Sequence, residues 1–192
     1  MFTSIFNYIS QFKNFTTEEK HIIESYFTFR QVPKKFALIK KGKIARELYF
    51  INKGLLRLYY SKDTEDITAF IFREHLFASC YDSFLRQAPG NQSLDTLEDV
   101  ELLVISYDDL QALYNKIPKM ETVARKIAEQ RFINAQMILS SYILDSPEER
   151  WKKFEATQGD LLLRVPHHMI ASFLGITPVS LSRIRKRLMK EN

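Results

Sequence analysis

Cysteine is almost absent from this chain of 192 residues, which contains only Cys80. A disulfide needs two thiols, and a zinc or iron–sulfur site built from thiolates needs several. The sequence therefore excludes an internal disulfide and a thiolate cluster. For Cys80 itself, a buried structural role is favoured, and a redox-sensing role stays open as the alternative.

Long hydrophobic runs are also missing. No apolar stretch approaches the roughly 20 residues of a membrane-spanning helix. The first residues, MFTSIFNYISQFKN, lack the basic start, apolar run and cleavage site of a secretory signal. The content of 45% hydrophobic and 27% charged residues is ordinary for a globular protein. The sequence predicts a cytoplasmic protein that does not act in a membrane.

Histidines are few, and nothing arranges them as metal ligands. His75 is the only histidine in the strand-rich region, where a metal enzyme of the cupin type would need several converging ligands. His167 and His168 are adjacent, so on a helix they would point about 100° apart. No Ser-His-Asp arrangement, glycine-rich nucleotide loop or paired acid cluster is visible. We expect no metal, no cofactor and no catalytic residue, although a sensing role for His75 stays open.

The net charge of +5 is concentrated at one end of the chain. Residues 178–192 contain five basic residues and one acidic residue, so this segment alone carries +4. The remaining 177 residues are therefore close to neutral. Such an asymmetry is typical of a body with one end that binds a polyanion.

The residue pattern predicts strands in the first half of the chain. After a helix over about 16–27, short β-branched and aromatic runs recur up to about residue 105. The run ELYFI–NKG–LLRLYY reads as a hairpin, because Asn52 and Gly54 can take the positive φ of a tight turn. Evenly spaced strands with turn signals indicate an antiparallel barrel, roll or sandwich of about 75 residues.

Helices are predicted after residue 106. One covers 107–115, and a longer one covers 119–144, which is about 39 Å at 1.5 Å per residue. That length exceeds what one small core requires, so pairing with a second copy is favoured over a plain core helix. Ser146, followed by Pro147 and two glutamates, is a strong helix start. The run LLLRV at 161–165 reads as a short strand.

The C-terminal segment reads as two short helices joined by a tight turn. The first covers 166–174, and Gly175 can adopt the left-handed conformation that ends a helix. Thr177 then offers a capping hydroxyl, and Pro178 suits the first helical position because its missing N–H costs nothing there. Such a pair, with a basic second helix, indicates a helix-turn-helix. Its second helix, 178–190, would lie in the DNA major groove.

Individual roles follow from positions on this second helix. Arg183 has a guanidinium that can pair with both O6 and N7 of guanine. The other residues expected to face bases are Pro178, Val179 and Ser180, and those expected to meet phosphates are Thr177, Ser182, Arg185 and Lys186. The alternative for this segment is an ordinary amphipathic helix with a solvated basic face.

Three stretches resemble the Crp/Fnr family of bacterial transcription regulators: IASFLGITPVSLSRIRKRL, LYFINKGLLRLYY and SPEERW. The resemblance implies an α+β protein with an N-terminal antiparallel β-roll of the cyclic nucleotide-binding kind (1–118), a dimerisation helix (119–145) and a C-terminal winged helix-turn-helix (146–192). It implies a homodimer that binds double-stranded DNA at a roughly palindromic operator, with a small-molecule effector left undefined. It also makes His167 a candidate DNA contact.

The sequence departs from the family pattern at two places. Cyclic-nucleotide binders of the family carry Gly-Glu and then Arg before Ser or Thr, whereas here no glycine precedes Glu74 and Gln87 follows Arg86. Because that glycine lets backbone N–H groups approach a phosphate, cyclic AMP is not the expected effector. The family geometry would place an effector near Glu74, Ser79, Arg86 and Asn134. The second departure is Val179, which replaces a glutamate and can offer bases only apolar contact, for example with a thymine methyl.

Two other functions stay open at this point. The strand-rich part could be a small-molecule-binding or metal-dependent cupin-like β-roll that does not bind DNA. The basic end could instead bind an acidic protein partner.

Overall fold

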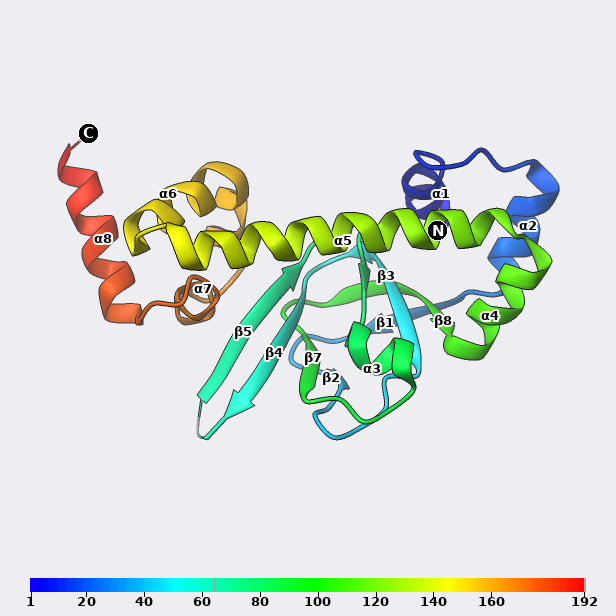
Figure 1. Cartoon of the computed structure of the whole chain (residues 1–192), viewed down its shortest axis with the longest axis horizontal. Helices are drawn as coiled ribbons and strands as arrows, with labels where there is room; N and C mark the ends of the chain where they lie inside the picture. The colour runs from blue at the N-terminus through cyan, green and yellow to red at the C-terminus, as the bar shows by residue number, and fades with distance from the viewer. Residues whose placement is uncertain (64, 192) are drawn as a thin grey trace.

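A computed structural model describes residues 1–63 and 65–191 (Figure 1). The strands are β1 (Thr28–Val32), β2 (Ala37–Ile39), β3 (Glu47–Lys53), β4 (Leu56–Lys62), β5 (Glu65–Phe72), β6 (Phe77–Ala78), β7 (Gln92–Thr96) and β8 (Val100–Ser106). The helices are α1 (Thr3–Ile9), α2 (Thr17–Ser25), α3 (Tyr81–Arg86), α4 (Tyr107–Lys116), α5 (Lys119–Leu144), α6 (Pro147–Gln158), the 3-10 helix η1 (Gly159–Leu163), α7 (His167–Phe173) and α8 (Pro178–Glu191). In Figure 1 the strands lie beneath α5, with α1, α2 and α4 at one end of that helix and α6, α7 and α8 at the other.

The strands form two four-stranded antiparallel sheets. One has the order β1-β8-β3-β6 and the other the order β2-β7-β4-β5. Side chains from both sheets meet in a core, where Ile51 and Leu102 from the first sheet and Leu56 and Leu94 from the second are fully buried. The α+β class and the antiparallel roll predicted from the sequence are thus confirmed.

The predicted β3–β4 hairpin is wrong. β3 pairs with β6 and β8, whereas β4 pairs with β5 and β7 in the other sheet. Gly54 takes φ +90°, as expected for a turn, and Asn52 does not take a positive φ. A Cβ at Gly54 would lie 2.8 Å from the Asp99 carbonyl oxygen. A tight turn serves equally well for a hairpin and for a crossing between sheets, so only the distant partner strands distinguish the two.

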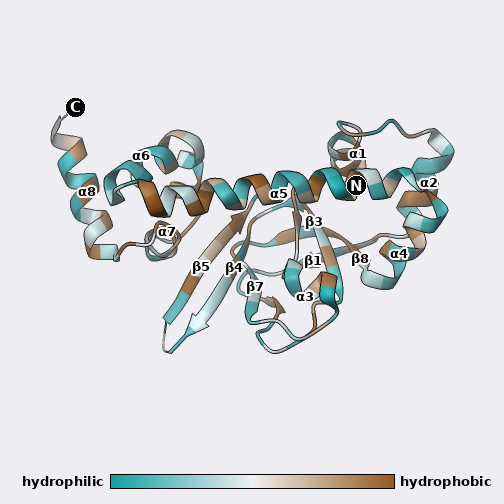
Figure 2. Ribbon diagram, in the orientation of Figure 1, coloured by the Kyte–Doolittle hydropathy of each residue, from teal (hydrophilic) through white to brown (hydrophobic). Residues whose placement is uncertain are grey.

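Helix α5 has the predicted bounds and two different halves. Near its start, Met120, Val123 and Ile127 are buried against the β-roll. Further along, large apolar side chains lie in solvent, among them Met137 at 66% and Ile143 at 72% exposure. Figure 2 shows apolar segments recurring along the whole helix. The second half of α5 therefore carries an apolar surface that the chain itself does not cover.

The C-terminal helices form a second core, which includes Trp151, Phe154 and Leu161. The predicted strand at 161–165 is wrong, because residues 159–163 form η1 instead. Leu161 is fully buried while Leu163 is 93% exposed, and no partner strand lies beside the segment. No strand follows β8 among the described residues up to 191, so the β wing that the resemblance implied is not found there.

The turn between α7 and α8 matches its prediction. Gly175 takes φ +66°, and the Thr177 hydroxyl accepts a hydrogen bond of 3.1 Å from the Ser180 amide at the start of α8. Pro178 is the first residue of α8. At the start of α6, Ser146 and Glu149 form a complete capping box. These caps depend only on residues within four positions, which is why the sequence reveals them.

Candidate nucleic-acid interface and effector cavity

Helix α8 has one buried face and one exposed face. Leu181 and Ile184 are buried against α6 and α7. Residues three and four apart lie on one face of a helix. By that spacing, the exposed side chains of Val179, Ser182, Arg183 and Lys186 form a single stripe, which we call the α8 stripe. Four residues predicted to meet DNA therefore share one solvent-facing surface.

Within the α8 stripe, Arg183 makes no ion pair or side-chain hydrogen bond with the rest of the described chain. Its guanidinium is thus available to an external acceptor. Val179 is 59% exposed at the first turn, beside the exposed Pro178. An exposed apolar residue next to a free arginine provides both the apolar contact and the forked donor that base edges recognise.

Other predicted contacts are held by neighbouring protein groups. The Arg185 guanidinium lies 5.6 Å from the Trp151 ring centroid, and one of its nitrogens is 3.3 Å from both ring nitrogens of His167. Thr177 and Ser180 are joined through their hydroxyl groups at 3.0 Å. The Arg185 contacts fasten α8 to α6 and α7, a role that the sequence pattern does not indicate, whereas the Thr177–Ser180 contact is local to the start of α8.

A large cavity of about 830 Å³ lies between the β-roll and α5. Its walls come from β4 and β5, from α3, and from α5 between Met120 and Tyr142. Of the four predicted effector residues, Ser79 and Asn134 line it. Glu74 and Arg86 do not, so the structure does not bring the four together.

Glu74 instead joins the β-roll to the C-terminal helices. Its carboxylate accepts hydrogen bonds from the Gly54 amide at 2.9 Å and from Arg164 at 2.5 and 3.2 Å. Arg164 also donates to Glu98 at 2.6 and 2.9 Å. Burial alone would raise the pKa of Glu74, but the bonds from Arg164 and Gly54 outweigh it and leave that pKa lowered. Sequence patterns gave no signal for Arg164, because its partners lie 66 and 90 residues away.

The surroundings of Arg86 do not suit a ligand-binding role. It forms an ion pair with Asp82, four residues earlier on α3, and its side chain is 60% exposed. The Ser79 hydroxyl donates a hydrogen bond of 2.8 Å to the Glu47 carbonyl. The phosphate-binding arrangement that the family pattern would place here is therefore not assembled from these residues.

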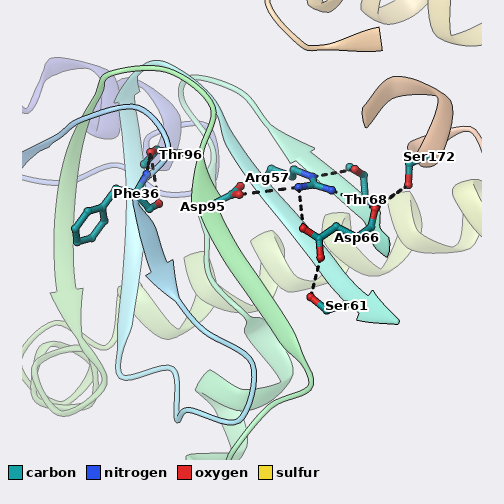
Figure 3. Close-up of polar contacts among 8 residues, drawn as sticks. All are labelled: Phe36, Arg57, Ser61, Asp66, Thr68, Asp95, Thr96 and Ser172. Carbon is teal, nitrogen blue, oxygen red and sulfur yellow. Dashed lines mark hydrogen bonds and ion pairs between the residues drawn. The ribbon is translucent and has the colours of Figure 1, made fainter. Parts of the chain in front are cut away.

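A second set of polar contacts couples β5 to α7 (Figure 3). The Thr68 amide donates a hydrogen bond of 3.0 Å to the Ser172 hydroxyl on α7, and Arg57 donates to the Thr68 hydroxyl at 2.9 Å. Arg57 also lies 3.8 Å from Asp66 and 4.0 Å from Asp95. Burial raises the pKa of Asp95 to about 6, against the opposing effect of Arg57. The first helix of the helix-turn-helix is thus hydrogen-bonded directly to the β-roll.

The remaining candidates from the sequence are Cys80 and His75. Burial raises the pKa of the Cys80 thiol to about 12, which keeps it protonated and unreactive. His75 is exposed in a left-handed turn with φ +64°. Over residues 1–63 and 65–191, no three His, Cys, Asp or Glu side chains cluster in a way that could hold a metal ion. In those same ranges no helix has the length and apolar character needed to cross a bilayer.

Comparisons with known proteins agree with this architecture. A family model described as the cyclic nucleotide-binding domain matches residues 29–116. The cyclic AMP receptor protein of Thermus thermophilus is 24% identical over 186 residues, covering 94% of this chain and 85% of that protein. Among solved structures, a regulator assigned to the Crp/Fnr family from Eubacterium rectale matches with a TM-score of 0.74 at 17% identity, covering 96% of this chain and 88% of that one. FixK2 from Bradyrhizobium japonicum matches with a TM-score of 0.73 at 15% identity, covering 86% and 85%. This chain is thus similar to the cyclic nucleotide-binding domain over residues 29–116, and it shares the fold of the Crp/Fnr-type regulators over most of its length.

Proposed function

We propose that the protein is a homodimeric transcription regulator that binds a roughly palindromic DNA operator through α8. In this proposal residues 1–118 sense an effector, 119–145 form the dimer contact and 146–192 bind DNA, in the cytoplasm and without catalysis. The observation that carries it is the α8 stripe, whose free Arg183 lies in the segment that holds +4 of the +5 net charge. The Thermus relative, a cyclic AMP receptor protein by name, supports the regulatory role.

The exposed half of α5 supports the dimer. Phe132, Leu139 and Ile143 are 65%, 53% and 72% exposed, and apolar side chains seven and four residues apart lie on one face of a long helix, where packing against a second helix stabilises them. A dimer must present its two recognition helices about 34 Å apart to reach successive major grooves. Pairing through α5 sets the distance between the two recognition helices. A change in the position of α5 relative to the β-roll alters that distance.

The structure favours an effector other than cyclic AMP. In the family pattern a glutamate and an arginine belong to the phosphate-binding cassette. Here the Glu74 carboxylate accepts hydrogen bonds from Arg164 and from the Gly54 amide, and Arg86 forms an ion pair with Asp82 on the surface. Neither group is free to hold a ligand in the cavity beside α5.

Binding to a random-sequence DNA duplex tests the DNA-binding role. We expect affinity that falls steeply between about 50 and 200 mM salt, because phosphate contacts release counterions. An acidic peptide of matched charge should compete weakly. If the peptide binds as well as the duplex, the basic end serves a protein partner and the proposal is wrong. Stoichiometric metal in the purified protein, with no DNA binding, would favour the cupin-like alternative.

A further inference from the structure

The cavity beside α5 has mostly apolar walls. Phe70 and Phe72 from β5, Phe77 from β6 and Ile138 from α5 are among its lining residues. Its volume of about 830 Å³ falls within the roughly 300–1,000 Å³ typical of small-molecule sites. Such walls favour a ligand with an apolar body over one that needs many hydrogen bonds.

Among the described residues, only two charged side chains line this cavity, Asp82 and Arg131, and they differ in their ion-pair partners. Asp82 is neutralised by Arg86 at the surface. Arg131 projects from the middle of α5 and has no carboxylate within 4 Å in the described ranges. Its guanidinium lies 4.7 Å from the ring centroid of Phe72 and 5.5 Å from that of Phe70, and it donates a hydrogen bond to the Phe77 carbonyl. Arg131 is therefore a cation held among aromatic rings without a counter-ion.

This arrangement leaves much of the binding capacity of Arg131 unused. A guanidinium has five N–H donors, and the Phe77 carbonyl is the acceptor that the described residues supply. Arg131 is half-buried beside Phe70 and Phe72, and this loss of hydration lowers the pKa of its guanidinium. A charge withdrawn from water without a partner costs free energy. A ligand that brings an anion to this position removes that cost.

A planar carboxylate is the anion that best matches the arginine fork, since two parallel N–H···O bonds can form. A cyclic nucleotide would also bring sugar hydroxyls and a polar base, which need partners. The Ser79 hydroxyl is already bonded to the Glu47 carbonyl, and the Gln92 amide already donates to the Tyr60 hydroxyl, so Gln111 and Asn134 are the amides that the walls have left to offer. The apolar walls favour an apolar ligand body, and the single cation favours a carboxylate on that ligand.

Resting on the sensor role proposed above, we infer that the effector is an organic carboxylate with an apolar body, whose carboxylate pairs with Arg131. The apolar body lies along α5, against Phe70 and toward Tyr142. The cavity reaches Ser172 and Gly175 in the helix-turn-helix, so an occupant of that end contacts the β-roll, α5 and the DNA-binding helices together.

The test is calorimetric titration of the full chain with two acid and neutral pairs: decanoate with 1-decanol, and 2-naphthoate with 2-naphthol. At least one acid should bind about tenfold or more tightly than its neutral partner, the discrimination that one charge-assisted pair provides. Arg131→Met should abolish that preference while the neutral compound still binds. Arg125→Met, an exposed arginine on the same helix, should leave the preference unchanged.

Equal binding of acid and neutral compound in both pairs overturns the inference, as does a preference that survives Arg131→Met. Tight cyclic AMP binding that excludes the acids also overturns it. If Arg131→Met fails to fold by circular dichroism, the comparison of acids with neutral compounds in the unaltered protein still decides. The titration contains no DNA, so a negative titration does not contradict the proposed DNA-binding role. In the same way, absence of DNA binding does not contradict the assignment of the ligand.

Discussion

Gly175, in the turn of the helix-turn-helix, lies directly against the ring of Tyr142 near the end of α5. A Cβ built on Gly175 would come within 2.7 Å of Tyr142 Cε1. The Tyr142 hydroxyl donates to the Phe173 carbonyl, and the Arg150 guanidinium lies 5.5 Å from the same ring. This end of α5 is therefore in close contact with α6, with α7 and with the turn that precedes α8.

Substitution of Gly175 by alanine should reduce stability and DNA binding together. The new methyl group meets Tyr142, and an L-residue at φ +66° costs about 1–2 kcal/mol in addition. Tyr142→Ala in the same chain removes the clash but not the backbone strain, so the double variant should regain only part of the lost stability. Urea unfolding of the two single variants and the double variant measures this coupling. Strict additivity of the two changes would show that the contact is unimportant.

Arg183→Ala should weaken binding to the preferred operator by about 1–3 kcal/mol, roughly 5- to 150-fold, if the guanidinium reads a base. Arg183→Lys keeps the charge but loses the fork, so it should relax sequence preference while retaining most non-specific affinity. Lys186→Ala should weaken binding to all sequences alike. Fluorescence anisotropy with operator and scrambled duplexes separates these results, and Arg125→Ala serves as the control for loss of one exposed charge. An unaltered sequence preference in Arg183→Ala contradicts the assignment.

Arg164→Ala should loosen the C-terminal helices from the β-roll. Arg164 donates to both Glu74 and Glu98, and its loss leaves two partly buried carboxylates without a cation. We expect faster amide hydrogen exchange in η1 and α7 and little change in β1 and β8. Arg73→Ala breaks the more exposed pair with Asp160 and should have a smaller effect. Equal exchange in the two variants would remove Arg164 from its coupling role.

Asp95 should make stability depend on pH. Its pKa is raised from 3.8 to about 6 in the folded state, so the folded protein binds the proton more tightly than the unfolded chain. Stability from this group is therefore greatest below about pH 4 and is lost as the pH rises through 6, by about 1–3 kcal/mol. The difference in unfolding free energy between the unaltered protein and Asp95→Asn should change over this range. A difference that is constant from pH 4 to 7 contradicts the shifted pKa.

Sequence reasoning succeeded where the deciding contacts are local. The starts of α5 and α8 follow from Pro118, Thr177 and Pro178, whose effects act within one turn. It failed where distant partners decide. The turn at Gly54 gave no sign that β3 and β4 belong to different sheets, and the three leucines at 161–163 gave no sign that a neighbouring strand was missing.

The candidate site divides in the same way. The exposed stripe on α8 follows from helical spacing, so Arg183 could be singled out from the sequence. The role of Arg131 could not, because Phe70, Phe72 and Phe77 come from strands more than fifty residues earlier. Glu74 and Arg86 were carried over from the family pattern, and their actual partners, Arg164 and Asp82, show that a shared fold does not preserve a ligand contact when the surrounding residues change.

The central claim, that a dimer of this chain reads DNA through α8, is tested most directly by selection of bound duplexes from a random pool. We expect enrichment of two-fold symmetric sequences with half-sites about 10 base pairs apart, or a multiple of that spacing. The same selection with Arg183→Ala should lose the preference at one position in each half-site. A bound pool that shows no enriched sequence, or enriched sites without two-fold symmetry, would contradict the account.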